Sequence, residues 1–449
     1  MKLFNILFLV VFFSNSLFSQ KILNERDRAQ IVDQILEDRM TNLLPKLMRK
    51  AGINMWVIIS REYNEDPVMK TMLPSEWLSA RRRTIMVFSD KGQKEGVERL
   101  AIARYDVGQL LKGEWDLNIN PDQWDALIKI IEERKPENIG LNFSKFYAHA
   151  DGLTHTEYGE FMAKLPQKYH SKVVSASDLA VSWLETRTEK EMTIYQQIGR
   201  ISHQIIEEAF SDAVIQPGVT TTDDVVWWLR QKVTDLGLET WFHPTVDIQR
   251  QSPDAFDHLR TFSKRPNQQI IMPGDLLHCD FGITYLRLNT DQQQMAYVLK
   301  PNELEVPDYL KVAMKQGNRL QECLTENFLL GKSGNDILAG ALAQAKKEGI
   351  NGTIYTHPIG NHGHAAGPTI GMWDNQGKTI GTGDYKLNAN TAFSIELNAA
   401  VELEEWKKPV RIMLEEDGFF DEAGKFRYID GRQMEILPIP RKMQNNSRN

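Results

Sequence analysis

Five potential metal ligands recur in a fixed order through the carboxy-terminal half of this 449-residue chain. They are four carboxylates and one imidazole: Asp280, Asp291, His364, Glu396 and Glu415. Such donors suit hard or borderline divalent cations, and carboxylates that share their oxygens can bridge two cations about 3.5 Å apart. The set therefore requires a fold that brings distant segments together around a dinuclear metal site.

The two aspartates lie at the ends of segments that are typical of neighbouring strands. An apolar run from Leu276 ends at Asp280, the pair Phe281-Gly282 allows a bend, and residues 283–288 can pair back towards Asp291. A single aspartate beside a strand more often lies in a solvated turn. The later ligands make one shared cavity the better interpretation.

The histidine lies in a glycine-rich loop, residues 355–374, which carries His357, His362 and His364. Glycines let a backbone come close to a metal or substrate, and clustered imidazoles bind borderline metals or donate to developing negative charge. The loop is therefore a candidate for both metal binding and catalysis.

The two glutamates each end an apolar, strand-like run, residues 391–396 and 410–415. A buried carboxylate without a partner is costly, so this arrangement favours bound cations. The alternative is that each glutamate faces outward beside Lys407 or Lys408.

In these contexts the order Asp, Asp, His, Glu, Glu resembles the M24 metallopeptidases of the pita-bread fold, especially Xaa-Pro aminopeptidases and prolidases. The resemblance rests on Gly-Asp-Leu before Asp280, a spacing of eleven residues to Asp291, the Gly363-His-x-x-Gly turn, Phe393-Ser-Ile-Glu396, and Arg411 before Glu415. It implies a creatinase-like α/β amino-terminal domain followed by an α+β pita-bread catalytic domain. It also argues against metal-free relatives such as creatinase, because every ligand position is filled.

Three positions have alternatives within this resemblance. His362 competes with His364 as the metal ligand, and Glu416 competes with Glu415. An outer histidine that contacts the substrate in the family corresponds to His258, with His243 as the weaker candidate.

Two segments depart from the family pattern. The family usually shows Thr-Arg-Thr after the second aspartate, whereas residues 292–296 read Gln-Gln-Gln-Met-Ala. A family histidine after the metal loop is replaced at Trp373-Asp374, and His357 or His362 could supply the missing donor. These changes affect groups around the peptide and not the metal ligands. They therefore leave the identity of the substrate open, while the metal site is unaffected.

The resemblance implies a reaction. Two divalent ions, manganese, cobalt or zinc, would be held by Asp280, by the bridging pair Asp291 and Glu415, and by His364 with Glu396. They would generate a hydroxide that attacks the peptide carbonyl, with Glu396 as the proton shuttle. Besides Glu396, the catalytic candidates are three histidines that could donate to the oxyanion: His258, His357 and His362. In related enzymes the substrate is a peptide with a free amino terminus and proline at the second position.

Composition and the amino terminus bear on localisation and partners. A net charge of −7 gives no reason to expect nucleic-acid binding. Residues 1–19 have a positive start, an apolar core from Leu3 to Phe13 and a small-residue end, which predicts a signal peptide and an exported, periplasmic or secreted enzyme without a stable membrane anchor. The alternative is a retained anchor helix. Related proteins are often dimers, so a homodimer is an expectation by analogy.

The remaining chain divides into a predicted α/β domain at residues 20–176, a catalytic domain at residues 177–440 and a polar tail at residues 441–449. A chain with 41% hydrophobic residues is long enough for two cores. Two other functions stay open. One is a metal-dependent hydrolase of the same fold that acts on a different C–N bond, and the other is a binding protein without turnover.

Overall fold

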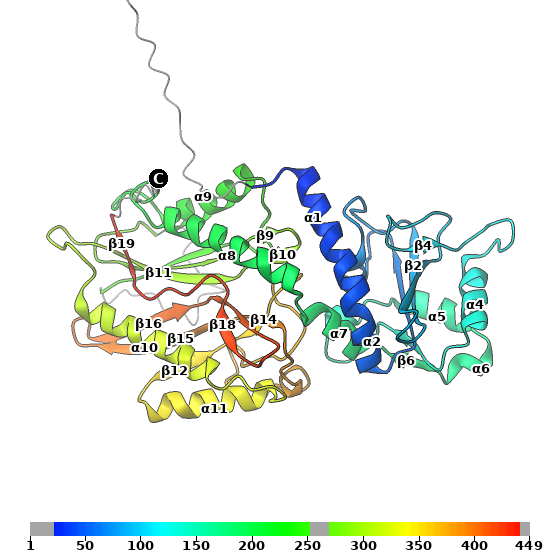
Figure 1. Ribbon diagram of the computed structural model, residues 1–449. Helices are drawn as coiled ribbons and strands as arrows, with labels where there is room; N and C mark the ends of the chain where they lie inside the picture. Colours follow the sequence, from blue (N-terminus) through cyan, green and yellow to red (C-terminus); the bar gives the residue numbers. More distant parts are fainter. Residues whose placement is uncertain (1–21, 252–268, 441–449) are drawn as a thin grey trace, which may run out of the picture.

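The computed structural model describes residues 22–251 and 269–440. An amino-terminal α/β part precedes a larger α+β part, and the two lie side by side (Figure 1). The predicted signal peptide and polar tail fall outside the described residues. Among the described helices, none is both long and apolar enough to cross a membrane.

The amino-terminal part is built on a six-stranded sheet in the order β4-β3-β2-β1-β5-β6. Its strands are β1 (Met55–Arg61), β2 (Arg83–Asp90), β3 (Val97–Ala101), β4 (Lys112–Gly113), β5 (Ile139–Leu141) and β6 (Val173–Ser175). Its helices are α1 (Glu25–Asp38), continued by a π-helical turn (Arg39–Leu43) into α2 (Leu44–Ala51), then α3 (Pro67–Met72), α4 (Gln123–Arg134), a 3-10 turn (Ala148–Ala150), α5 (His155–Lys164) and α6 (Gln167–His170).

Side chains alternate along β1, which explains why both faces of this sheet are covered. Trp56 and Ile58 pack in one buried cluster with α2 and α3, whereas Met55, Val57 and Ile59 pack in the other with α4 and α5. Helix α7 (Ser177–Glu185) also contributes its apolar side chains to the first cluster. The amino-terminal core therefore continues past residue 176.

The α+β part places strands between two pairs of helices. The helices are α8 (Glu189–Ala209), α9 (Thr222–Asp235), α10 (Asp308–Thr325) and α11 (Gly334–Lys347), with a short 3-10 turn at Thr382–Asp384. The strands are β7 (Thr245–Gln249), β8 (Leu276–Phe281), β9 (Thr284–Tyr285), β10 (Leu288–Asn289), β11 (Gln292–Val298), β12 (Asn351–Ile354), β13 (His357–Pro358), β14 (Thr391–Ser394), β15 (Leu397–Leu403), β16 (Lys408–Leu414), β17 (Asp417–Phe420), β18 (Phe426–Tyr428) and β19 (Leu437–Ile439).

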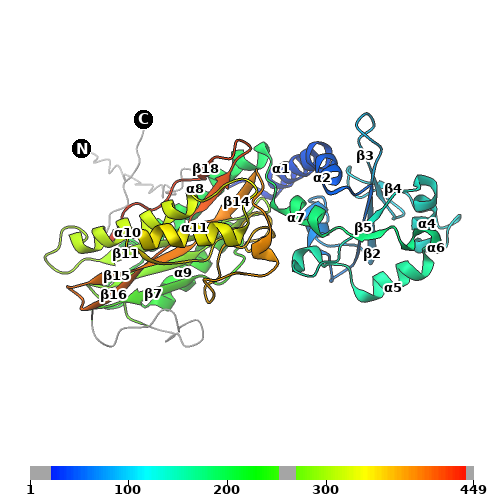
Figure 2. The ribbon, with the colours of Figure 1, turned by 90° about the horizontal axis from the view of Figure 1, so that it is seen from below.

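The strands form sheets in the orders β19-β11-β8-β7, β12-β15-β16 and β13-β14-β17-β18, with a separate β9-β10 hairpin. One isolated bridge, Gln293 to Glu415, joins the first sheet to the end of β16. Helices α8 and α9 lie on the opposite side of the strands from α10 and α11, as the two views in Figures 1 and 2 show.

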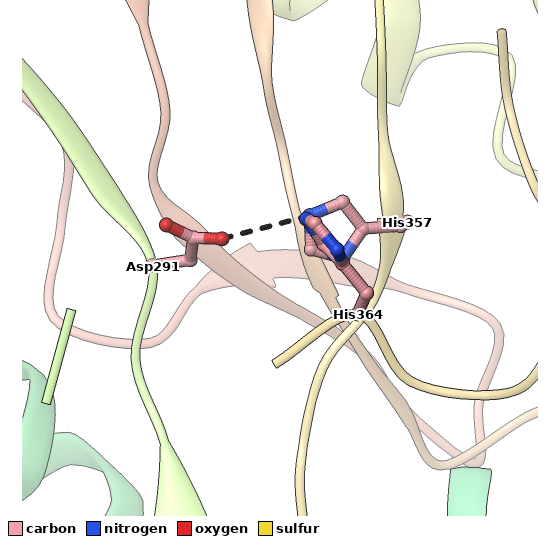
Figure 3. A group of neighbouring side chains, drawn as sticks. All are labelled: Asp291, His357 and His364. Carbon is pink, nitrogen blue, oxygen red and sulfur yellow. Dashed lines mark ion pairs between the residues drawn. The ribbon is translucent and has the colours of Figure 1, made fainter. Parts of the chain in front are cut away.

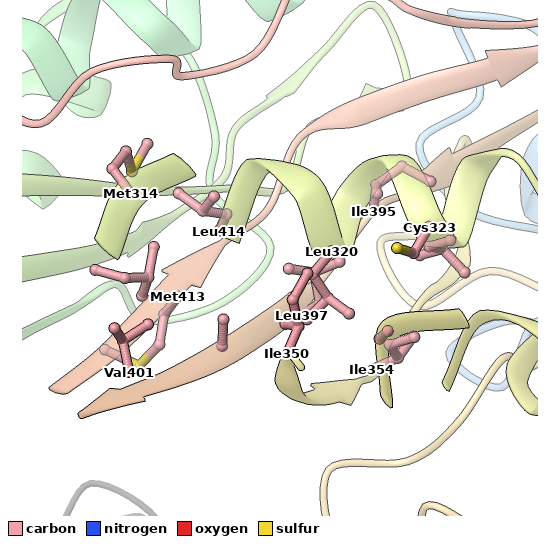
Figure 4. Close-up of a cluster of buried hydrophobic side chains, with 14 of the residues drawn as sticks. Met314, Leu320, Cys323, Ile350, Ile354, Ile395, Leu397, Val401, Met413 and Leu414 are labelled. Carbon is pink, nitrogen blue, oxygen red and sulfur yellow. The ribbon is translucent and has the colours of Figure 1, made fainter. Parts of the chain in front are cut away.

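Each helix pair covers its own buried cluster. Helix α10 packs on β15 and β16 through residues such as Leu320, Cys323, Leu397 and Leu414 (Figure 4), and α11 packs beside α10 in the same cluster. Helices α8 and α9 pack on β8 and β11 in a second cluster. The two packed faces hold the strand ends rigidly, and the candidate metal ligands lie at these ends.

Candidate metal centre

The candidate ligands come from strand ends that the sheets bring together. Asp280 lies near the end of β8, opposite Gln293 of the antiparallel β11, and Asp291 comes directly before β11. Glu396 lies between β14 and β15, and Glu415 directly follows β16. Because β11 bridges to the end of β16, the four carboxylates from distant parts of the chain surround one space.

Three overlapping groups of side chains have ligand atoms within 4.8 Å of one another. The groups are Asp280 with Asp291 and Glu415; His357 with Glu396 and Glu415; and Asp291 with His357 and His364. All five ligands expected from the sequence lie in this cluster, together with His357, to which the sequence assigned only a role as a donor to the oxyanion. Asp291, Glu415 and His357 each belong to two groups. The overlap is the arrangement that two neighbouring cations require.

His357 points into the cluster (Figure 3). Its Nε2 atom is buried, lies 3.6 Å from Asp291 Oδ2 and 3.7 Å from Glu415 Oε1, and has no hydrogen-bond partner among the described residues. Its Nδ1 atom lies 2.9 Å from the carbonyl oxygen of Pro358, which favours the tautomer that leaves Nε2 unprotonated. A buried imidazole nitrogen that faces two carboxylates at this distance fits a cation between them.

The carboxylates repel one another strongly. Burial raises the pKa of Asp291 well above its ordinary value, and the charges of Glu415 and Asp280 raise it further. Burial, followed by Glu415 and Asp280, has the same effect on the pKa of Glu396. A divalent cation would relieve this repulsion, so the donor set fits the metals expected from the sequence.

The histidines differ in their surroundings. Burial alone would lower the pKa of His357, but its interaction with Glu415 outweighs burial and raises the pKa above the ordinary value. His364 is exposed at the edge of the cluster with its ring centroid 4.6 Å from that of His357, and partial desolvation and His357 lower its pKa to about 4. His364 therefore offers a neutral imidazole, which is the form that binds metals.

The other histidine candidates lie elsewhere. His362 packs against His149 of the amino-terminal part, with 4.6 Å between ring centroids, and burial and His149 lower its pKa to about 4. His243 contacts the exposed Trp227 and lies outside the three ligand groups. His258, the first choice for the outer histidine, lies outside the described residues.

Glu415 and Glu416 face different partners. Glu415 joins the cluster, whereas Glu416 Oε2 lies 2.6 Å from His203 Nε2 and Glu416 Oε1 accepts a hydrogen bond from the backbone N–H of Gln433. Burial lowers the pKa of His203, but the charge of Glu416 and the hydrogen bond with Asp430 raise it to about 10 overall. Glu416 is therefore held in an ion pair outside the ligand cluster.

Aromatic side chains fix the glycine-rich loop. Trp241 lies 5.2 Å from His364 between ring centroids, and a Cβ atom at Gly363 would overlap the Trp241 ring. Tyr355 lies 5.7 Å from His357 on the same measure. Trp373, which stands where the family has a histidine, has an exposed side chain.

Sequence reasoning missed the side chains that support the ligands. Gln293 donates hydrogen bonds to Glu396 and Glu415, and Ser394 donates a short hydrogen bond to Glu415. The alternation of side chains along β11 puts Gln293 on the same face as Asp291, which is the signal that could have identified it.

The cluster of carboxylates and imidazoles at the strand ends of this two-part fold could hold divalent metal ions. The model of metallopeptidase family M24 matches residues 193–419, about half of the chain. The chain therefore belongs to metallopeptidase family M24 and is a metallopeptidase of that class. No curated protein sequence matches it significantly.

Solved structures share the fold over most of the chain. An X-Pro aminopeptidase from Thermotoga maritima matches with a TM-score of 0.61 and 19% identity, over 88% of this chain and 99% of its own. An Xaa-Pro dipeptidase from Bacillus anthracis matches with a TM-score of 0.57 and 16% identity, over 92% of this chain and 100% of its own. A prolidase from Pyrococcus furiosus matches with a TM-score of 0.54 and 16% identity, over 87% of this chain and 99% of its own. The expected α/β domain followed by a pita-bread domain is confirmed.

Proposed function

We propose that this protein is an exported aminopeptidase that uses two divalent cations to remove the amino-terminal residue before a proline. The observation that carries the proposal is the overlap of three ligand groups through Asp291, Glu415 and His357. Overlapping groups favour two neighbouring cations over one. Solved structures of the same fold are named X-Pro aminopeptidase and Xaa-Pro dipeptidase, which supports proline at the second position.

Each ligand has a proposed place. Asp280, Asp291, Glu396 and Glu415 would hold the cations together with an imidazole. His364 is the imidazole that the sequence favours, and His357 is a second candidate because its Nε2 atom faces both Asp291 and Glu415. When bound, the cations would supply positive charge for a carbonyl oxygen and lower the pKa of a water molecule.

The protein's own groups move the proton and orient the peptide. Glu396 has a raised pKa in its buried position, which suits a group that takes a proton from the attacking water and gives it to the leaving amine. An imidazole that does not bind a cation can donate to the oxygen of the tetrahedral intermediate, and His357, His362 and His258 are the candidates. The buried surroundings of His357 exclude water from this donor.

Localisation and assembly are also proposals. The sequence of residues 1–19 supports export to the periplasm or the medium. A homodimer is proposed only by analogy with related proteins. A peptide with a free amino terminus is the proposed substrate, and no nucleic acid is expected as a partner.

The test is a metal count and a peptide panel on the purified mature chain. We expect about two metals per chain with Mn²⁺, Co²⁺ or Zn²⁺, cleavage before proline, and loss of both in Asp291→Ala. The exposed Asp235→Ala, at the end of α9, is the matched control and should behave like the wild type. Protein that binds no metal would refute the dinuclear site.

A second function has one specific observation in its favour. Buried glutamines replace the family's usual residues after Asp291, and Gln293 contacts two candidate ligands. This altered surrounding is compatible with hydrolysis of a different C–N bond. Two metals per chain without cleavage of any Xaa-Pro peptide would support that function over the first.

A further inference from the structure

Gln293 lies between two of the candidate metal ligands. Its side-chain Nε2 atom donates to Glu396 Oε1 at 2.8 Å and to Glu415 Oε2 at 2.7 Å. An amide nitrogen carries two hydrogens, so one Gln293 side chain can satisfy both carboxylates at once. Gln293 is 5% exposed, and water therefore cannot easily replace either hydrogen bond.

The other end of the amide is held as well. Gln293 Oε1 lies 2.7 Å from Nε2 of His278, a buried side chain on β8. Nδ1 of His278 lies 3.5 Å from Oδ2 of Asp247 on β7. Asp247, His278 and Gln293 thus form a line of buried polar groups across three adjacent strands, which ends at the candidate ligands.

The two carboxylates fix which way the amide points, because both need a donor. His278 donates to Gln293 Oε1 when its proton is on Nε2, and the amide nitrogen then faces Glu396 and Glu415. A reversed amide would place an oxygen against two carboxylates and leave all three as acceptors. The contacts of Gln293 with His278 and with the two carboxylates therefore select one orientation.

The orientation decides which carboxylate oxygens Gln293 holds. Gln293 holds Oε2 of Glu415, while Ser394 donates to Oε1, the oxygen that also faces Nε2 of His357. Glu396 is held at Oε1 and keeps its other oxygen for a ligand role. Ligands that are held before a metal arrives lose less conformational freedom on binding it.

We propose that Gln293, oriented by its contacts with His278 and the two carboxylates, is a positioning residue that holds Glu396 and Glu415 in the geometry for metal binding. The inference rests on the proposed metal centre but not on the proposed substrate. It also gives the unusual glutamine segment after Asp291 a physical role.

The neighbouring Gln294 supplies a matched control. Gln294 is also a buried glutamine of β11, but its Nε2 atom reaches Glu416 at 3.3 Å and not the ligand cluster. Loss of a buried amide is therefore similar in Gln293→Met and Gln294→Met, and only the first variant removes contacts to candidate ligands.

The experiment is a titration of the chelator-stripped full chain with Mn²⁺, Co²⁺ or Zn²⁺ against a fluorescent competing chelator. Gln293→Met should weaken metal affinity by about 10- to 100-fold, the usual effect of losing a group that supports a metal ligand. Gln294→Met should keep the wild-type affinity. Thermal midpoints of both metal-free variants show whether each remains folded.

A second variant covers the case in which Gln293→Met fails to fold. Gln293→Asn keeps an amide but is one methylene shorter, so it cannot reach His278 and both carboxylates together, and the same loss of affinity is expected. Wild-type affinity in a folded Gln293 variant, or equal losses in the Gln293 and Gln294 variants, would overturn the inference. A wild-type protein that binds no metal would overturn the metal centre and this inference together.

Discussion

Glu185 offers a test of how the amino-terminal part supports the glycine-rich loop. It ends α7, is 1% exposed, and its Oε1 atom accepts hydrogen bonds from the Tyr385 hydroxyl at 2.9 Å and from Asn388 Nδ2 at 2.8 Å. Its Oε2 atom is buried without a hydrogen bond among the described residues. A Cβ atom at Gly367 of the loop would lie 3.1 Å from this Oε2 atom. Glu185 therefore packs against the glycine-rich loop at Gly367.

Burial raises the pKa of Glu185 from 4.5 to about 7, although the hydrogen bonds from Tyr385 and Asn388 oppose the shift. At about 1.4 kcal/mol per pKa unit, this shift corresponds to roughly 3 kcal/mol. A carboxyl group with a raised pKa in the folded state contributes stability below its unfolded pKa and loses that contribution as pH rises through the folded value. The loss should therefore occur between about pH 4.5 and pH 7.

Glu185→Gln removes the ionisation and keeps an acceptor for Tyr385. We expect its free energy of unfolding, relative to the wild type, to rise by up to roughly 3 kcal/mol between pH 5 and pH 8. The assay is urea unfolding followed by tryptophan fluorescence at several pH values, with the exposed Glu404→Gln as the control. A difference between variant and wild type that does not change with pH, or that falls as pH rises, would refute the reasoning.

Two further predictions concern the metal centre. In metal-free protein, Asp291→Asn should become more stable relative to the wild type as pH rises above the ordinary range of a carboxyl group, because burial, Glu415 and Asp280 raise the pKa of Asp291. Thermal scans in chelator at several pH values check this, and a difference in stability that does not change with pH would contradict it. Gly363→Ala should lower the free energy of unfolding by about 1–3 kcal/mol and weaken metal binding, because the added Cβ atom would overlap Trp241. Gly159→Ala is the control and should not destabilise the fold, because its Cβ atom would meet nothing within 4 Å. Urea unfolding and metal titration compare the two variants, and equal effects would refute the packing argument.

Much of the fold could be predicted because local patterns agree with the tertiary structure. The continuous apolar run from Met55 to Ile59 is typical of a strand with both faces buried, and the structure covers each face with helices. The acidic residues at the strand ends, Asp280, Asp291, Glu396 and Glu415, lie together because antiparallel pairing brings those ends to one place. Family membership and the two-part architecture expected from the resemblance are confirmed.

The choice among histidines could not be made from the sequence. His357, His362 and His364 lie within eight residues in a loop without regular secondary structure beyond the two residues of β13. Their directions depend on contacts with distant residues: Trp241 against Gly363, and His149 against His362. Spacing favoured His364, whereas the packing of the loop brings His357 to the carboxylates as well.

Buried charges then connect the amino-terminal part to this loop. Arg39 donates to Glu191 Oε2 and Arg187 donates to Glu191 Oε1, both at 2.7 Å, and all three side chains are almost fully buried. Arg187 also donates to Asn361 Oδ1 at 3.2 Å, within the glycine-rich loop. Removing one member of such a network leaves an uncompensated buried charge, which is far more costly than losing a surface ion pair. The amino-terminal part is thus connected to the loop that carries the histidines. Arg39 and Asn361 are more than three hundred positions apart, too far for any local sequence pattern to reveal the connection.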